Sequence, residues 1–323
     1  MANDEHLQRF LQSTDQEWEQ WREQNPDMAL DLSHVDLTRI NERTRLTNMR
    51  FVNLCQSDGS FTTFLSGADL SSANLFQINL CHADLDETNL SFANLQQADL
   101  MFATLSHASL HNTDLRFAKL MGAEFSDANL AYANCMYADM RGAEFERANL
   151  QGANLSYISA CSVTMSDGNL EDVILQGADL RGAYLDNCVF HTKQHRTNLT
   201  QARFVHAYLM KSDLRNVDLQ GSDLTFALLT NARLEEANLS HTNLFRAALR
   251  EANLQGANLT GANLQGAILV DTNLRGANLT GANLQGANLT DAHLDQADLT
   301  DANLQDIETN FRNDLDDFDE FDA

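Results

Sequence analysis

The sequence is short of proline, of basic residues and of long hydrophobic runs. One proline and 15 glycines in 323 residues exclude a collagen-like chain and a chain rich in linkers. The 21 lysines and arginines are outnumbered by 46 acids, and a net charge of -25 disfavours direct binding to nucleic acid or to an anionic membrane. No stretch approaches the roughly 18 apolar residues of a membrane span. Since 43% of the residues are hydrophobic, the chain can nevertheless bury a large core.

The cysteines are few, odd in number and without CxxC spacing. They are Cys55, Cys81, Cys135, Cys161 and Cys188, and this pattern indicates free thiols of the kind that a reducing cytosol maintains. The first residues, MANDEH, lack the basic and apolar segments of a secretory signal. We therefore expect a cytoplasmic protein.

A five-residue repeat dominates the sequence. Apolar centres recur at every fifth residue from Leu65 to Phe190 and again from Leu199 to Leu304, which gives 48 centres, 40 of them leucine. Two residues before each centre stands a mostly small residue, usually Ala, with Thr, Ser, Val or Ile as variants, and the residue between them is Asn or Asp at most positions. A period of five suits neither an α-helix nor a long strand. It suits a three-residue extended segment with its first and third side chains inward, followed by a two-residue corner.

Longer sequence segments recur at an interval of 20 residues. ANLTGANLQGA begins at Ala257 and again at Ala277, and GAEF begins at Gly122 and again at Gly142. Four pentapeptides per turn would place such copies directly above one another. The tandem A-[DN]-L-x-x words resemble the pentapeptide-repeat family, and this resemblance implies an all-β solenoid, a right-handed quadrilateral β-helix. With 48 centres we expect about 12 coils and, at ~4.8 Å per coil, a solid rod about 58 Å long.

An N-terminal helical cap is predicted for residues 1–31. One or two helices are expected over residues 4–24, because Thr14-Asp15-Gln16-Glu17 has the form of a capping box and Pro26 ends the pattern. The apolar residues of this segment share a helical stripe: Leu7, Phe10, Leu11, Trp18 and Trp21. Such a cap would cover the first coil of the β-helix.

The remaining boundaries follow the repeat. Residues 32–190 form the first block of the β-helix, ragged to about residue 64 and regular from residue 65, and residues 199–305 form the second block. Residues 191–198 form a short basic loop or a register slip, in which residues 193–196 bulge from a corner; the alternative places His195 near the interior. Residues 306–323 form an acidic C-terminal cap, a dimer contact or a solvated tail, with Phe311, Leu315 and Phe318 at helical spacing.

Motifs that carry chemistry are weak in this sequence. His107 and His111, like His191 and His195, have the i, i+4 spacing of helical zinc sites, but no helix is expected at either place. No nucleophile elbow, P-loop or dinucleotide-binding motif is present. We predict no catalytic, cofactor-binding or metal-binding residues and no enzymatic activity.

Acidic residues gather on one side of the predicted coil. If four pentapeptides make a turn, nine of the 16 acids between residues 66 and 190 share one side, opposed only by Arg147. This candidate partner-binding stripe consists of Asp84, Asp86, Glu87, Glu124, Asp127, Glu144, Glu146, Asp167 and Asp186.

The first functional hypothesis is a non-enzymatic scaffold that presents a rigid, partly acidic surface to an unidentified protein partner, as a monomer or as a homodimer through a terminal cap. The alternative comes from the resemblance, because some members of the family imitate DNA and inhibit or protect type II topoisomerases such as gyrase. B-DNA carries ~0.6 charges per Å, whereas the stripe would carry ~0.3 per Å at one coil per ~4.8 Å. The scaffold is therefore the preferred interpretation.

Overall fold

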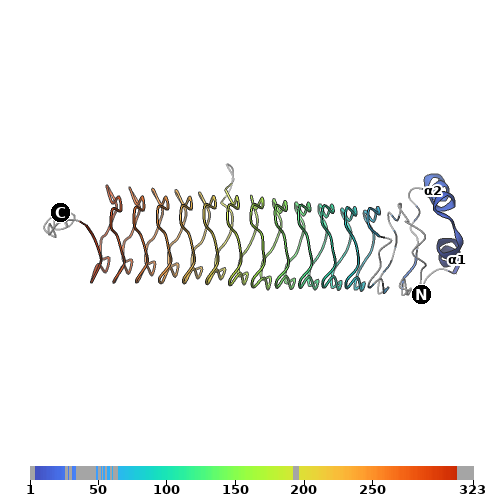
Figure 1. The fold of residues 1–323 in the computed structure, drawn as a ribbon, viewed down its shortest axis with the longest axis horizontal. Coiled ribbons are helices and arrows are strands. Elements are labelled where there is room, and N and C mark those ends of the chain that lie inside the picture. Colours follow the sequence, from blue (N-terminus) through green and yellow to red (C-terminus); the bar gives the residue numbers. More distant parts are fainter. Residues whose placement is uncertain are drawn as a thin grey trace. The chain divides into compact units, whose positions relative to one another are not determined.

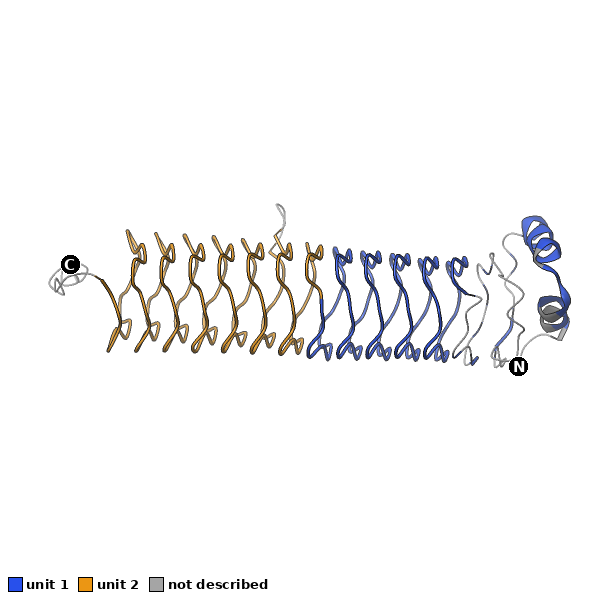
Figure 2. Cartoon of the chain, viewed as in Figure 1, with its two compact units in different colours: residues 1–164 blue, residues 165–323 orange. Residues whose placement is uncertain are grey.

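The structure, a computed structural model, describes residues 4–25, 28, 31–33, 49, 52, 54, 57, 58, 60, 65–191 and 196–310. It divides into two compact units, unit 1 from Met1 to Thr164 and unit 2 from Met165 to Ala323 (Figure 2). Several residues that enter the predictions above lie outside the described residues, namely Pro26, Cys55, His195, Phe311, Leu315 and Phe318.

Two helices begin unit 1, α1 from Asp4 to Gln12 and α2 from Asp15 to Gln24 (Figure 1). The predicted capping box is confirmed, because the Thr14 side chain accepts the Glu17 N–H and the Glu17 carboxylate accepts the Thr14 N–H at 2.9 Å. Phe10 of α1 and Trp18 of α2 are buried and pack edge to face with ring centroids 5.7 Å apart. The helices thus pack on each other through Phe10 and Trp18 of the predicted apolar stripe.

The regular repeats form coils of 20 residues in both units. Each pentapeptide contributes one residue to an isolated parallel β-bridge, and the partners lie 20 residues apart, as in Asp69 with Asn89 and Asn258 with Asn278. Because bridges recur at five-residue intervals, every coil has four sides, and Figure 1 shows these coils stacked within each unit. The rungs stay one bridge wide because the chain turns after every three residues. Each unit is therefore a four-sided β-solenoid.

Each residue of the Ala-Asn-Leu motif has its own structural role. Ala262 and Leu264 point inward and are 1% exposed. Between them, the Asn263 side chain accepts the N–H of Gln265 at the corner and donates to Asn243 of the preceding coil, at 3.2 and 3.0 Å. One amide thus satisfies a corner N–H and links two coils, which is why Asn suits this position.

A hydroxyl or thiol in place of the inward Ala makes a further link between coils. Five such side chains donate to a main-chain carbonyl 23 residues earlier, over 2.8 to 3.0 Å: Thr88, Thr113, Cys188, Thr242 and Thr272. Burial raises the pKa of the Cys188 thiol to about 12, so the thiol keeps the proton that it donates. Cys81, Cys135 and Cys161 likewise form no disulfide.

The second corner residue has a positive φ throughout the regular coils. At one corner of unit 1, φ is 58° at Phe102, 65° at Gly122 and 62° at Gly142. The Ala123 N–H donates to the Leu120 carbonyl at 3.0 Å and closes the corner as a β-turn. A turn with positive φ at its third residue favours glycine, yet most residues at this position are not glycine. Each of those costs ~1 kcal/mol of backbone strain.

Two alanine variants distinguish the cost of this backbone strain from the cost of a steric clash with a neighbouring side chain. A Cβ at residue 142 would meet nothing within 4 Å, whereas a Cβ at residue 122 would lie 2.6 Å from the Phe102 ring. We expect Gly142→Ala to lower the free energy of unfolding by ~1 kcal/mol and Gly122→Ala to lower it further. Urea denaturation measures both, and replacing Phe102 with Ala should remove the difference. Equal losses in the two variants would contradict the assigned corner.

Four extra residues enter unit 2 between Phe190 and Leu199. The bridge partners there are 24 residues apart, as in Ile174 with Asn198, and the interval returns to 20 from Asn198 with Asp218. The Thr197 hydroxyl donates to the Phe190 carbonyl at 2.6 Å and holds the two ends of the insertion together. The rungs therefore stay in register across an insertion whose residues 192–195 lie outside the described residues.

Candidate functional site

Seven acids of the predicted stripe lie in unit 1, on one side of the solenoid and on the corner that follows it. Glu124 bridges Thr104 in one neighbouring coil and Glu144 in the other, and Thr104 bridges Asp84. We call the set the acidic side of unit 1: Asp84, Asp86, Glu87, Glu124, Asp127, Glu144 and Glu146. The other two predicted residues, Asp167 and Asp186, belong to unit 2.

Two of these acids have structural roles that the sequence did not reveal. Asp84 accepts the N–H of Asp86 at 3.2 Å, and Asp86 accepts the N–H of Ser106 in the next coil at 2.9 Å. In unit 2, Asp186 accepts the N–H of Met210 at 2.8 Å in the same manner. These carboxylates stabilise corners, so they are less available to a partner.

Arg147 neutralises part of the acidic side. Its guanidinium donates to both carboxylate oxygens of Asp127, at 2.9 and 2.6 Å, and lies 3.5 Å from Glu146. The side-chain hydrogen bond from Arg147 lowers the pKa of Asp127 below its ordinary value.

Removing this guanidinium is expected to raise the pKa of Asp127. A lowered pKa in the folded protein stabilises the fold above the ordinary value near 3.8, and this contribution is lost as the pH falls through the lowered value. Arg147→Gln should therefore move the titration of the Asp127 carboxyl, followed by NMR, to higher pH. Arg181→Gln, which removes one of the two cationic partners of Asp179 in unit 2, is the matched control and should leave Asp127 unchanged. An unmoved Asp127 titration in Arg147→Gln would rule out the ion pair in solution.

Glu87, Glu124 and Glu144 remain exposed, and within the described ranges none of them forms an ion pair. Glu124 and Glu144 occupy neighbouring rungs ~5 Å apart, where two carboxylates in water repel by ~1 kcal/mol. On other sides this position holds Asn on Asn in some neighbouring coils, as in the hydrogen bonds from Asn149 to Asn129 and from Asn94 to Asn74. Glu124 and Glu144, both acceptors when ionised, cannot form such a hydrogen bond between coils.

The other acids of unit 1 that contact a cation are neutralised locally. Lys119 pairs with Asp99 at 2.9 Å, and Arg116 pairs with Asp114 at 2.7 Å. Arg141 pairs with Asp139 at 2.6 Å, and this guanidinium hydrogen bond lowers the Asp139 pKa. Within the regular coils of residues 65–164, the unbalanced negative charge is thus concentrated on the acidic side.

The sequence interpretation also missed the aromatic side chains at the corners of unit 1. Phe117, Tyr137 and Tyr157 are exposed and stacked, with successive ring centroids 5.2 and 5.3 Å apart. At another corner His111 lies edge-on to Phe92 and Tyr132, both at 5.7 Å. Aromatic residues 20 positions apart at the second corner position are the signal that could have revealed the stack.

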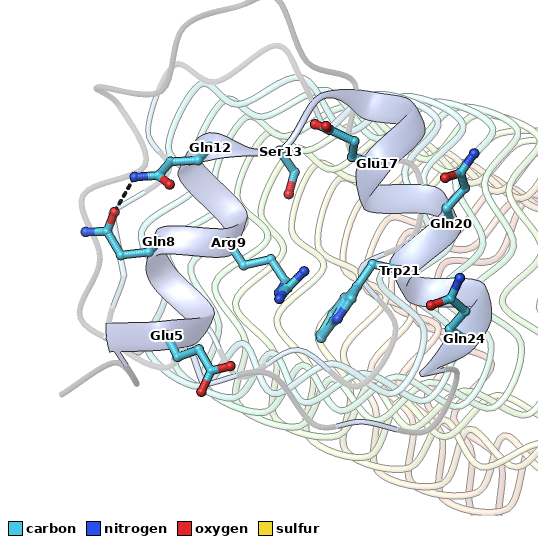
Figure 3. Close-up of a pocket in the computed structure, with 9 residues that line it drawn as sticks. All are labelled: Glu5, Gln8, Arg9, Gln12, Ser13, Glu17, Gln20, Trp21 and Gln24. Atoms are coloured by element: carbon cyan, nitrogen blue, oxygen red, sulfur yellow. Dashed lines mark hydrogen bonds between the residues drawn. The ribbon is translucent and has the colours of Figure 1, made fainter.

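A cleft of about 560 Å³ lies between α1 and α2 and is open to solvent (Figure 3). The Arg9 guanidinium lies over the Trp21 ring, 4.9 Å from its centroid, and Gln12 donates to Gln8 at 2.6 Å. Hydrogen bonds from the Thr14 N–H and hydroxyl lower the pKa of Glu17. Gln8, Arg9, Gln12 and Glu17 thus have local structural partners in the cleft.

Two negative findings apply to the described residues only. No cluster of three or more His, Cys, Asp or Glu side chains there is arranged to hold a metal ion. In the same part of the chain, neither helix has the length and apolar character needed to cross a membrane.

The four-sided coils and their five-residue repeat define a class of β-solenoid protein, and the comparisons with known proteins identify the family. The sequence profile for pentapeptide repeats matches in eight copies that extend over residues 65–191 and 195–306. The chain belongs to the pentapeptide-repeat family. The comparison with curated proteins found no match.

Three solved structures illustrate the similarity. QnrB1, a plasmid-mediated fluoroquinolone resistance protein, is 19% identical over 65% of this chain and 93% of that chain, with a TM-score of 0.40. HetL, involved in heterocyst differentiation regulation in the cyanobacterium Nostoc sp. strain PCC 7120, is 24% identical over 95% and 96%, with a TM-score of 0.21. Rfr23 from the cyanobacterium Cyanothece 51142 is 38% identical over 42% and 86%, with a TM-score of 0.18.

Proposed function

We propose that this protein is a non-enzymatic scaffold that binds a partner protein through the acidic side of unit 1. The observation that carries the proposal is the pair of stacked, exposed carboxylates of Glu124 and Glu144. Local rules of stability are commonly broken at functional sites, because function retains residues that stability alone would replace. The partner is expected to offer lysines and arginines, since these restore the missing charge balance.

The architecture that we propose for the whole chain is a right-handed quadrilateral β-helix of about 12 coils. In it α1 and α2 act as the cap of residues 1–31, residues 32–190 and 199–305 form the two blocks, and residues 306–323 form an acidic cap or tail. The full burial of Trp18 supports the cap, because a large indole side chain can be fully buried only where other parts of the protein cover it. We further propose a monomer or homodimer located in the cytoplasm, which fits the free thiols of the described cysteines.

Affinity capture from the native cell with matched charge variants tests the scaffold. The test variant replaces Glu87, Glu124, Glu144 and Glu146 with Lys and keeps Asp84 and Asp86, which accept main-chain N–H groups. The control variant makes the same change of charge at exposed acids of unit 2, by replacing Glu236, Asp271, Asp301 and Asp306 with Lys. A protein recovered by the wild type and the control but lost by the test variant supports the scaffold. Equal recovery by both variants would remove the acidic side as the interface.

The second candidate is a DNA-mimicking modulator or protector of a type II topoisomerase. The exposed carboxylates that recur on successive coils of unit 1 favour it, because DNA-binding enzymes recognise regularly spaced negative charge. A gyrase supercoiling assay with added protein tests this alternative. Inhibition, or protection against a quinolone, that disappears in the test variant supports mimicry, and no effect at high protein concentration would exclude it.

A further inference from the structure

One side of unit 2 carries apolar residues at the position where the other sides mostly carry Asn or Asp. Its bridge residues pair from coil to coil in one continuous row, which consists of Tyr184, Tyr208, Leu228, Ala248 and Ile268. The side chains point outward, since Tyr184 and Ile268 are 42% and 41% exposed. The two tyrosine rings stack with centroids 4.6 Å apart. We call this set the apolar row of unit 2.

The corner that precedes the apolar row extends its hydrophobic surface. His206 stacks on Phe226 at 4.9 Å, and Phe226 meets the ring of Phe245 edge-on at 5.7 Å. The Arg246 guanidinium lies over Phe245, 5.2 Å from the ring centroid. Row and corner together form an aromatic and aliphatic surface of the kind found at the centre of protein interfaces.

The charges around the middle of the apolar row are mainly positive. Arg246 belongs to the preceding corner, and Lys211 and Arg250 belong to the corner that follows, where Glu251 is the acid beside Arg250. All four side chains are exposed. The corner that follows also carries Asp271 beside Ile268 at one end of the row and Asp186 beside Tyr184 at the other, and Asp186 accepts the Met210 N–H. In a chain with a net charge of -25, this surface therefore suits an acidic segment that carries apolar side chains.

The chain itself contains such a segment at its C-terminus. Residues 311–323 read FRNDLDDFDEFDA, with six acids against one arginine. Phe311, Leu315 and Phe318 have the spacing of one apolar helical face. The segment thus combines the charge and the apolar groups that the surface requires.

The segment also starts on the correct side of unit 2. Ile268 bridges Asn288, and Asn288 bridges Glu308, which lies two residues before the last described residue. The start of the segment is therefore two rungs, or ~10 Å, from Ile268 and six rungs, or ~29 Å, from Tyr184. Thirteen residues span ~20 Å as a helix and ~43 Å when extended, so the segment can reach along the row.

We propose that residues 311–323 fold back onto the apolar row of unit 2 in the same chain. The apolar side chains of the segment cover Ile268 and Leu228, and its acids lie near Lys211, Arg246 and Arg250. This intramolecular contact is independent of the partner surface on unit 1.

Photo-crosslinking in the full-length protein tests this contact. p-Benzoyl-phenylalanine at position 318 is expected to give a product of monomer mass whose cross-link maps to peptides containing Leu228, Ala248 or Ile268. Replacing both Leu228 and Ile268 with Asp removes apolar groups from the row and should reduce the product about tenfold. Asn258→Asp with Asn278→Asp, on another side of unit 2, is the matched control and should leave the yield unchanged.

A second variant leaves the sequence of the coils unchanged, so that its effect cannot come from misfolded coils. Phe311→Asp with Leu315→Asp changes only the segment and should lower the yield to the same extent, with unchanged far-UV circular dichroism. Cross-links to other regions, or yields that neither variant changes, would overturn the proposal. A product of dimer mass would also overturn it, because the occupant would then be the segment of a second copy.

Discussion

Leu279→Asp is expected to unfold the coils around it. Leu279 is a repeat centre with no exposed surface, and its N–H donates to the Asp298 carbonyl of the next coil at 2.7 Å. A carboxylate placed there has no cation within the leucine core, and an uncompensated buried charge costs on the order of 3–5 kcal/mol. Because each coil is stabilised by its neighbours, the loss should spread beyond one rung. Far-UV circular dichroism and thermal melting measure the effect.

The neighbouring residue provides a matched control for this variant. Asn278 belongs to the same pentapeptide but is exposed, so Asn278→Asp adds the same carboxylate on the solvent side. We expect a change within about 0.5 kcal/mol for this surface substitution. If Leu279→Asp melted like the wild type, Leu279 would not point inward and the five-residue register would be wrong.

Phe125→Ala is expected to be the most damaging truncation in the core of unit 1. Phe125 and Phe145 are fully buried repeat centres on neighbouring coils, and their parallel rings stack with centroids 4.6 Å apart. Truncation leaves a cavity that the paired coils cannot close, so we expect a loss of about 3–5 kcal/mol. Phe125→Leu, which supplies the commonest centre residue, should cost less than ~1.5 kcal/mol. Urea denaturation measures both variants.

A ring that is stacked but exposed distinguishes the contribution of ring stacking to stability from the contribution of burial. Phe117 stacks on Tyr137 at 5.2 Å at a corner, where about half of its surface is exposed. Phe117→Ala should therefore cost only ~1 kcal/mol, since little apolar surface returns to water. A loss as large as that of Phe125→Ala would show that ring stacking, and not burial at the centre position, dominates the stability of these coils.

Much of the fold could be predicted because five-residue periodicity leaves few solutions. The inward position of Leu264, the outward position of Asn263 and the capping box at Thr14 all follow from local pattern. The 24-residue pairing across the insertion followed from the shift between Phe190 and Leu199. The two-unit division at Thr164 has no counterpart in the pattern, which runs through it without a break.

The candidate site could be predicted only in part. The register predicted which acids of unit 1 share a side, but not that Asp86 accepts the N–H of Ser106 one coil away. It also did not predict the two hydrogen bonds between Arg147 and Asp127. Such contacts depend on side-chain directions between coils, which alternation along a single coil does not specify. The outward tyrosines of unit 2 were not predicted, because Tyr184 and Tyr208 occupy the Asn position without altering the five-residue periodicity.

The affinity of a captured partner for the purified protein tests the acidic side of unit 1 most directly. Calorimetry with the wild type, the test variant of unit 1 and the control variant of unit 2 gives the three dissociation constants under identical salt. We predict that four lysines on the acidic side weaken binding about 100-fold or more, because attraction becomes repulsion at the interface. The control variant should bind like the wild type. Equal dissociation constants for the two variants would contradict a scaffold that binds through this side.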